Sequence, residues 1–263
     1  MRRHHSKKAC GFADWQPADG PSLKASAPAS IQTAVASGLM ALVAVVLAPG
    51  VALALPEGLE VRGGSLTVNK PDGSSLIINQ GSQRAAGDWR SFDIGNGERV
   101  EVRQPDARSL LLGRVTGGSA TQIQGALSAN GGVILINPNG LLIGPDAVIN
   151  TASFTASTSD VDPEAFMRGG PIEFQRSPLI PDDARIINQG TITVSDAGMV
   201  ALLAPQIQND GVIHARLGQV QLAGGTQATL DLSGDGLLNV VLDPAVAASI
   251  TNNGQISAGY VRV

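Results

Sequence analysis

The chain has 263 residues, of which 43% are hydrophobic, only 3% are aromatic and 32 are glycine. A chain of this length buries a sizeable core, but that core must be built from small aliphatic side chains, which suits layered β-strands better than a helical bundle. From Leu55 onward there are 13 basic and 20 acidic residues, a formal charge of −7 with Lys70 as the sole lysine, which argues against binding nucleic acid or an anionic membrane through a basic patch.

Residues 1–54 have the three parts of a secretory signal peptide. Met1–Lys8 is basic, Leu39–Leu47 is a short apolar run, and Ala52-Leu53-Ala54 places small residues at the positions that precede a cleavage site. The alternative is an uncleaved anchor, but the apolar stretch is shorter than the roughly 20 residues that a spanning helix needs. We predict a signal peptide with a long basic N-terminal region, cleaved after Ala54, and a mature protein of residues 55–263 without a membrane-spanning segment.

The only cysteine, Cys10, lies in this leader, so the mature protein is expected to contain no disulfide.

The first part of the mature chain contains short strands. Apolar and polar residues alternate in Leu59–Arg62, Ser65–Val68 and Val100–Arg103, and Leu76–Ile78 is a short apolar run. Lys70–Gly73 has the composition of a turn. The open end of a stack of such strands exposes unpaired backbone, so a fold of this kind needs a cap at that end.

The stretch from Asn130 to Thr158 is the most informative in the chain. The short apolar runs Val133–Ile136, Leu141–Ile143 and Ala147–Ile149 are separated by turn residues. Asn137-Pro138-Asn139-Gly140 places asparagine, proline and glycine where a tight turn prefers them. Strands this short, joined by turns this tight, are typical of the coils of a parallel β-helix, in which each coil is buried by its neighbours.

Residues Ser159–Asp183 interrupt this pattern. Asp162-Pro163-Glu164 provides a capping aspartate, a proline at the first helical position and an acidic residue in the first turn. We predict one or two helical turns there, in an excursion that packs against the coil rather than forming a part of it.

A repeat of the form Asn-x-Gly-x-Ile indicates the period of the coil. It occurs at Asn130/Gly132/Ile134, Asn188/Gly190/Ile192, Asn209/Gly211/Ile213 and Asn252/Gly254/Ile256. The spacings of 21 and 43 residues, the latter interpreted as two periods, suit a coil of three strands of about five residues each with turns between them. Asn and Gly tolerate positive φ at corners, and stacked Asn amides can form a ladder between coils.

These motifs resemble the N-terminal two-partner secretion domain, also called the haemagglutination activity domain, of filamentous-haemagglutinin-type exoproteins of Gram-negative bacteria. The resemblance covers nearly everything after the leader and is carried by Asn79–Arg84, Trp89–Gly95, Arg114–Gly118, Asn137–Leu141, Ala156–Thr158 and Met199–Pro205. It implies an all-β fold: a right-handed parallel β-helix, a single-stranded solenoid with an N-terminal cap and short extra-helical elements.

The resemblance also implies a function and its residues. Such a domain is exported through the periplasm, binds the periplasmic recognition domains of an outer-membrane β-barrel transporter, and folds outside the cell. Asn137, Pro138, Asn139 and Gly140 are the candidates for transporter recognition or for the folding nucleus. Trp89 and Phe92 are the candidate cap or core residues. Where one branch of the family has Asn-Pro-Asn-Leu, this chain has Gln104-Pro105-Asp106-Ala107, which places it nearer another branch.

Motifs for catalysis are scarce in the sequence. The mature part has one histidine, His214, which alternation with Ile213 points outward, so no histidine-based metal cluster is expected. Asp182-Asp183 resembles the acidic clusters of polysaccharide lyases but is better explained as a solvated turn. We therefore predict no enzyme, no catalytic or metal-binding residue and no cofactor.

Two alternatives belong to other functional classes. One is a β-helical polysaccharide-active enzyme, which needs clustered Asp, Arg and Lys on one face. The other is a stand-alone adhesive structural protein that uses its faces to bind host-cell glycan or matrix. Within the family, the cargo that follows such a domain is an adhesin, a haemolysin or a toxin.

Overall fold

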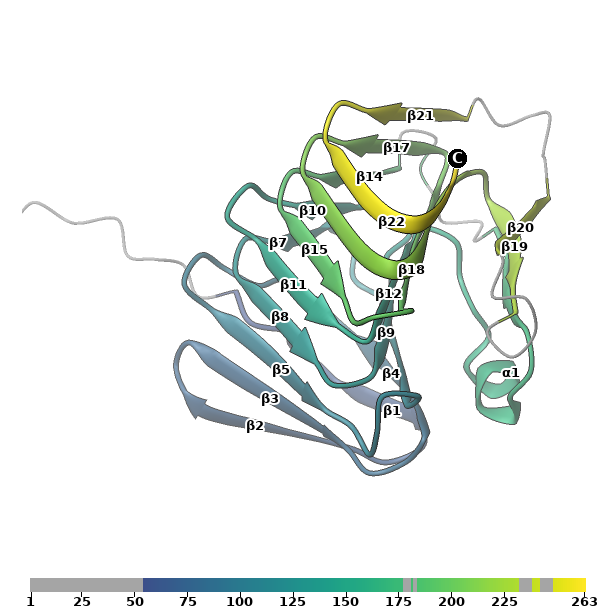
Figure 1. Ribbon diagram of the computed structural model, residues 1–263. Coiled ribbons are helices and arrows are strands. Elements are labelled where there is room, and N and C mark those ends of the chain that lie inside the picture. The colour runs from purple at the N-terminus through teal and green to yellow at the C-terminus, as the bar shows by residue number, and fades with distance from the viewer. Residues whose placement is uncertain (1–53, 177–180, 182–183, 232–237, 242–247) are drawn as a thin grey trace, which may run out of the picture. The chain divides into compact units, whose positions relative to one another are not determined.

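The strands wind as a parallel β-helix in which each coil contributes one strand to each of three faces. The computed structural model describes residues 54–176, 181, 184–231, 238–241 and 248–263, so Cys10, Asp182, Asp183 and nearly all of the predicted leader lie outside the described residues. Figure 1 shows the coils stacked in chain order, from β2 and β3 at one end to β21 and β22 at the other. The predicted all-β solenoid is confirmed.

The three faces are each made of parallel strands. Face 1 contains β3 (Ser75–Gln80), β5 (Arg99–Arg103), β8 (Ala126–Ala129), β11 (Val148–Thr151), β15 (Thr191–Val194), and the beginnings of β18 (Val212–Gly224) and β22 (Gln255–Arg262). Face 2 contains β4 (Arg84–Trp89), β6 (Leu110–Val115), β9 (Gly132–Ile136), β12 (Ser153–Ser157), β16 (Met199–Ala204), and the ends of β18 and β22. Face 3 contains β7 (Thr121–Ile123), β10 (Leu141–Ile143), β14 (Arg185–Asn188), β17 (Gln206–Asn209) and β21 (Ser249–Asn252).

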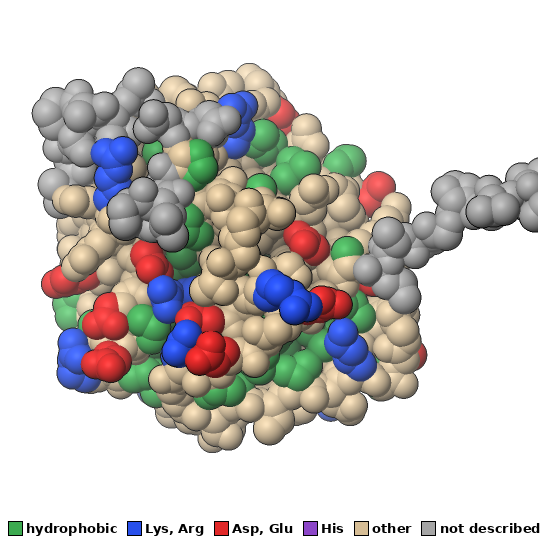
Figure 2. Space-filling model, turned by 180° about the vertical axis from the view of Figure 1, so that it is seen from behind, with side chains coloured by type: hydrophobic (Ala, Val, Ile, Leu, Met, Phe, Trp, Pro, Cys, Tyr) green, Lys and Arg blue, Asp and Glu red, His purple; other side chains and the backbone are tan. Residues whose placement is uncertain are grey.

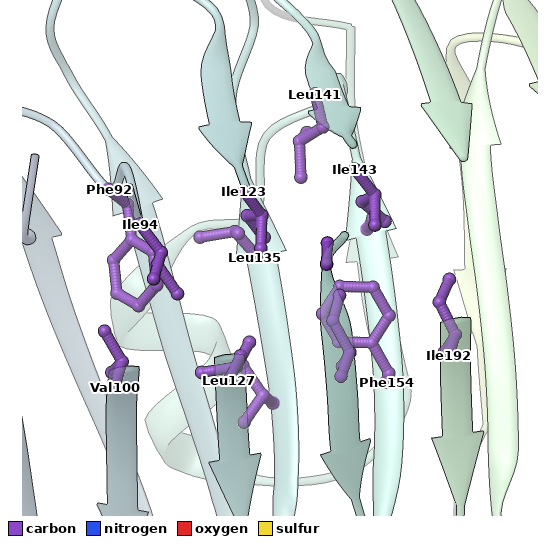
Figure 3. Packing of buried hydrophobic residues seen from close by; sticks show 14 of the residues in the cluster. Phe92, Ile94, Val100, Ile123, Leu127, Leu135, Leu141, Ile143, Phe154 and Ile192 are labelled. Carbon is purple, nitrogen blue, oxygen red and sulfur yellow. The ribbon is translucent and has the colours of Figure 1, made fainter. Parts of the chain in front are cut away.

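Columns of aliphatic side chains fill the interior of the coil. On face 1, Val100, Leu127, Ile149, Ile192 and Ile213 follow one another in register on successive strands, and all are fully buried. Figure 3 shows such side chains from the different faces pointing toward one another. Burial of each is worth about 1.5–3 kcal/mol, so the small aliphatic residues supply the core that the composition predicted.

Face 2 is buried on both of its sides. Its outward-pointing residues form a second apolar cluster with side chains from two excursions of the chain. This explains why β9 and β16 are uninterrupted apolar runs with every residue buried, whereas face 1 strands such as β11 alternate between exposed and buried positions.

The first coil is covered by two antiparallel strands. β1 (Glu60–Gly63) pairs with β4, and β2 (Leu66–Asp72) forms a hairpin with β3. The predicted cap is therefore present. The predicted turn at Lys70–Gly73 is displaced: Lys70 and Pro71 belong to β2, and the chain reverses at Gly73 and Ser74, where the carboxylate of Asp72 accepts hydrogen bonds from Ser74.

The two excursions leave the coil at the same corner, between face 2 and face 3. The first contains α1 (Pro163–Arg168) and β13 (Ile172–Phe174), and the second contains β19 (Gln227–Leu230) and β20 (Leu238–Val241). β13 pairs with β19 and β19 with β20, all antiparallel, so the excursions form one small sheet. Figure 1 shows α1, β19 and β20 beside the stacked coils.

The predicted helix is confirmed. Asp162 caps it by accepting hydrogen bonds from the backbone N–H groups of Glu164 and Ala165, and Pro163 is its first residue. Its Phe166 is buried, and Arg84 of β4 lies over the Phe166 ring and donates to the Phe166 carbonyl at 2.8 Å, which fixes the helix to face 2. The second excursion was not predicted.

The asparagine ladder exists, but its spacing was misinterpreted. The Nδ2 of Asn188 donates to Asn209 at 2.7 Å, and the Nδ2 of Asn209 donates to Asn252 at 2.6 Å. The 43 residues between Asn209 and Asn252 are therefore one coil plus the second excursion, not two coils. Assigning Asn130 to this repeat was also wrong, because Asn130 lies between faces 1 and 2, and Ile134 aligns with Thr155 of face 2.

Candidate functional site

Four of the six segments that carry the family resemblance, Trp89–Gly95, Arg114–Gly118, Asn137–Leu141 and Ala156–Thr158, meet at one corner of the coil. We call this the motif corner: residues 90–93, 116–120, 137–140 and 158–160, which follow β4, β6, β9 and β12 where the first coils leave face 2. The registers Trp89 to Val115 and Ile136 to Ser157 stack these strand ends. Parallel strands end at the same edge of a sheet, so residues far apart in the sequence become neighbours here.

Asn137 joins three successive coils at this corner. Its side chain is fully buried, and its Nδ2 donates to the carbonyl of Ser119 and to the hydroxyl of Thr121, both at 2.9 Å, on the preceding coil. Its Oδ1 accepts from the backbone N–H of Asn139 at 2.9 Å. Its own backbone N–H donates at 3.0 Å to the carbonyl of Ser157 on the next coil. Asn137 is thus a bridging residue as well as a turn residue.

Pro138 and Asn139 form the partly exposed tip of the turn. The Nδ2 of Asn139 donates to the carbonyl of Gly117 at 2.9 Å, so the tip is fixed to the Arg114–Gly118 segment of the preceding coil. Two of the family motifs are therefore in direct contact.

Gly140 closes the predicted turn, because its N–H donates to the carbonyl of Asn137 at 2.9 Å. Its φ is +101°, and a Cβ atom at this position would lie 2.6 Å from the carbonyl oxygen of Arg185 on the next coil. Both the backbone conformation and the close approach require glycine.

Trp89 and Phe92 lie in the first coil and are both buried at 1% exposure. Their rings meet edge to face with centroids 5.3 Å apart. Gly87 and Gly113 lie beside the indole, and a Cβ atom at either would be in ordinary van der Waals contact with the Trp89 Nε1, at 3.6 and 3.7 Å. The carbonyl of Trp89 accepts from the N–H of Thr116 at 2.8 Å, which ties these aromatic residues to the motif corner.

A chain of ion pairs borders the corner on the outer side of face 2. Arg62 of the cap pairs with Asp88 at 2.6 Å, Asp88 with Arg114 at 2.9 Å, and Arg114 with Asp160 at 2.7 and 2.8 Å. The hydrogen bond from Asp160 raises the pKa of Arg114 above its already high usual value. Asp160 begins the first excursion, so these pairs hold the cap, two coils and the excursion together.

Two adjoining pockets open at the motif corner. One of about 320 Å³ is bordered by Arg114, Thr116, Pro138, Asn139 and Asp160, and one of about 230 Å³ by Arg90, Phe92, Ser119 and Thr121. Both are also lined by Gly117 and Gly118. On the side of the molecule that Figure 2 shows, acidic and basic side chains are interleaved rather than gathered into an area of one sign. The pockets and the ion pairs of Arg114 offer a partner both shape and paired charges at the motif corner.

Among the described residues, no group of three or more His, Cys, Asp or Glu side chains is arranged so that it could hold a metal ion. His214 is exposed on face 1, as alternation predicted. No helix in the described part of the chain is long and apolar enough to cross a membrane.

Sequence reasoning missed the role of Gln104, which occupies the segment that departs from the family pattern. Its side chain is buried, its Nε2 donates to the carbonyls of Gly132 and Ser109 at 3.1 and 3.3 Å, and its Oε1 accepts from Gly131 at 2.8 Å. Like Asn137, it is a corner amide that bridges coils. The only indication in the sequence is that Gln104 directly precedes Pro105, as Asn137 directly precedes Pro138.

Comparisons with known proteins show what the chain as a whole is similar to. The family model described as "TPS secretion domain" matches residues 52–262. The chain is 38% identical over 212 residues to a heme/hemopexin-binding protein of Haemophilus influenzae, and this match covers 79% of this chain and 23% of that protein. It is 46% identical over 99 residues to another Haemophilus influenzae protein of the same name, and that match covers 38% of this chain and 11% of the relative. The chain thus spans less than a quarter of the length of these relatives.

A solved structure is also similar. The crystal structure of the HMW1 secretion domain from Haemophilus influenzae matches 79% of this chain and 57% of that chain, with a TM-score of 0.64 and 31% sequence identity.

Proposed function

Because the chain belongs to the TPS secretion domain family, we propose that its motif corner is where the domain engages an outer-membrane β-barrel transporter and where its folding begins. Members of this family are parts of two-partner secretion exoproteins, which are secreted through the periplasm, and the chain is a secretion domain rather than an enzyme. The finer roles, recognition and nucleation, are supported by the geometry of Asn137.

The observation that carries the proposal is the bonding of Asn137 to the coils on both sides. A buried amide must find partners, since an unsatisfied one costs about 1–3 kcal/mol. The partners of Asn137 lie on the preceding coil at Ser119 and Thr121 and on the next coil at Ser157. Its bonds are complete only when three coils are in place, which is the property of a nucleus from which a solenoid can grow coil by coil.

Recognition is supported by what the same turn exposes. Asn137 is buried, whereas Pro138 and Asn139 remain partly exposed beside the larger pocket. The buried residue therefore positions the two that a transporter's periplasmic recognition domains can contact. We assign recognition to Pro138, Asn139 and the pocket, and nucleation to Asn137 with Gly140. Trp89 and Phe92 close the first coil beneath the cap.

The leader completes the route. Residues 1–54 act as a signal peptide cleaved after Ala54, and the mature chain crosses the periplasm with only the coils of the motif corner formed, which the transporter binds. Folding outside needs no energy source, because each coil is stabilised by the one before it.

The cargo is a separate matter. The heme/hemopexin-binding relatives are much longer than this chain. The match to the first of them extends over 212 residues, which is about the length of the TPS secretion domain at residues 52–262 of this chain. The identity therefore supports secretion rather than ligand binding by this domain. The haemagglutinin-type adhesin remains our proposal for the class of exoprotein, with host glycan or matrix as the target of its downstream part.

The test compares secretion with stability. Asn137→Ala should lower the secreted fraction about tenfold, the effect of a loss of about 1.4 kcal/mol in binding the transporter, while lowering the melting temperature of the purified protein by a few degrees. The matched control is the double variant Asn188→Ala, Asn209→Ala, which removes buried amides from another corner. If both variants lose secretion in proportion to stability, Asn137 does not position Pro138 and Asn139 for recognition.

A further inference from the structure

Glu98 is a buried carboxylate whose partners are unusual. Its residue exposure is only 2%, and its two oxygens accept hydrogen bonds from the backbone N–H of Ala54 at 3.0 and 3.1 Å. One oxygen also accepts from the N–H of Gly95 at 2.6 Å. Within the described residues, no arginine, lysine or histidine forms an ion pair with it. A charge buried without a cation is costly, which calls for a partner.

The contact with Ala54 is informative because of where Ala54 lies. It precedes the predicted cleavage site, and the residues just after it are fixed in the fold. Leu55 is 7% exposed and belongs to the interior cluster, and the N–H of Glu57 donates to the carbonyl of Ser91 at 3.0 Å. The start of the mature chain is therefore held beside Glu98 with very little freedom.

We infer that Glu98 is the binding site for the α-ammonium group of the processed chain, which begins at Leu55. Hydrolysis of the Ala54–Leu55 peptide bond by a signal peptidase adds one water, leaving a carboxylate on Ala54 and an ammonium on Leu55. Successive residues are at most about 3.6 Å apart, so the new ammonium is created one residue spacing from the amide that Glu98 now binds. It supplies three donors and a full positive charge in place of one neutral N–H.

The consequence is that cleavage completes the cap. In the precursor Glu98 has only neutral donors, whereas in the mature chain it gains a cation that closes the first coil. The cap covers the open edge of the β-helix, so the N-terminal end becomes fully stable only after the leader is removed. This inference does not rest on the motif corner, and its tests need no transporter.

The chain offers a clean experiment, because Lys70 is the only lysine after the leader. In mature protein that carries Lys70→Arg, the α-amino group is the only primary amine, and its acylation by an N-hydroxysuccinimide ester at fixed pH can be followed by mass spectrometry. An ion pair that raises the pKa of this amine by about one unit slows acylation about tenfold relative to the urea-unfolded chain. Glu98→Gln should abolish most of this protection.

The matched control is Asp93→Asn. Asp93 is a partly buried carboxylate close by in the sequence, but its oxygen accepts from the N–H of Gln122 and not from Ala54. We expect it to leave the protection unchanged. Equal acylation rates for the protein that retains Glu98 and for the Glu98→Gln variant would overturn the inference, as would N-terminal sequencing that shows the leader retained.

A second measurement needs no variant at Glu98, in case Glu98→Gln fails to fold. Protein with Lys70→Arg is acetylated in urea and refolded. Acetylation of the α-amino group should lower the melting temperature by several degrees, and an unchanged melting temperature would overturn the inference.

Discussion

Two corners of the β-helix use buried asparagine amides to join coils, but they do so differently. At the corner between faces 3 and 1, Asn188, Asn209 and Asn252 bond to one another, so each coil repeats the same contact. At the motif corner, Asn137 bonds to a carbonyl and a hydroxyl of one coil and to a carbonyl of the next, rather than to another asparagine. Hydrogen bonds that repeat from coil to coil stabilise the solenoid in general. The hydrogen bonds of Asn137 instead fix one particular turn, which is where a partner can recognise this domain specifically.

The largest expected effect comes from replacing glycine at the motif corner, where one glycine is required by the backbone conformation and another is not. Gly140→Val should destabilise the protein by about 3 kcal/mol or more, because it combines a positive φ with a clash against the carbonyl of Arg185. Gly118→Val is the control, since nothing lies within 4 Å of its Cβ position, and a change within about 0.5 kcal/mol is expected. Urea denaturation measures both, and equal losses would show that the strain at Gly140 is unimportant.

The ladder corner should respond to loss of its amides through stability alone. The double variant Asn188→Ala, Asn209→Ala removes the hydrogen bond between two buried side chains and a second one to the exposed Asn252, and should cost about 2–3 kcal/mol. Thermal unfolding gives the value. The loss of secretion should be no larger than the loss of stability alone explains. A much larger loss would mean that the ladder also takes part in recognition, and the two corners would then not differ in function.

The ion pairs beside the motif corner provide a third comparison. Arg114→Met leaves the buried Asp88 with one partner and breaks the ion pair that holds Asp160, at the start of the first excursion, to β6, so we expect a loss of about 1–2 kcal/mol. Arg216→Met removes an exposed pair with Asp196 and should cost less than about 0.5 kcal/mol. Equal costs at the two sites would show that burial does not strengthen the chain of pairs.

The smallest effect concerns Asp93, whose pKa is raised by burial and lowered only in part by the N–H of Gln122. An acid with a higher pKa in the folded state binds its proton more readily there, so stability falls as the pH rises past its usual value of about 3.9. Asp93→Asn removes that loss. We expect a gain of less than about 0.5 kcal/mol at pH 7 that disappears below about pH 3. A variant that is less stable at pH 7 would contradict this explanation.

The difference between the two corners also explains what the sequence could predict. The ladder was visible because Asn188, Asn209 and Asn252 repeat, and the turn at Asn137 was visible because Asn, Pro and Gly have strong local preferences. The helix after Asp162 was predicted for the same local reason. These are features that a few neighbouring residues determine.

Features that depend on distant residues were missed. The 43-residue spacing before Asn252 equals about two periods by coincidence, so the second excursion was taken for an ordinary coil. Its pairing with β13 joins segments that no local pattern connects. Likewise, nothing near Asn137 in the sequence identifies Ser119 and Thr121 as its partners, and nothing near Glu98 indicates that it reaches Ala54.

The most direct test of the central claim is the secreted fraction of Asn139→Ala plotted against its melting temperature. Variants of the ladder corner define the line that relates secretion to stability. Asn139 is partly exposed, and Asn139→Ala removes the hydrogen bonds from its Nδ2 to Gly117 at 2.9 Å and to Asn137 at 3.3 Å, so the melting temperature should fall by no more than a few degrees. We predict that Asn139→Ala falls well below that line, with secretion reduced several-fold. A position on the line would contradict the assignment of recognition to the motif corner.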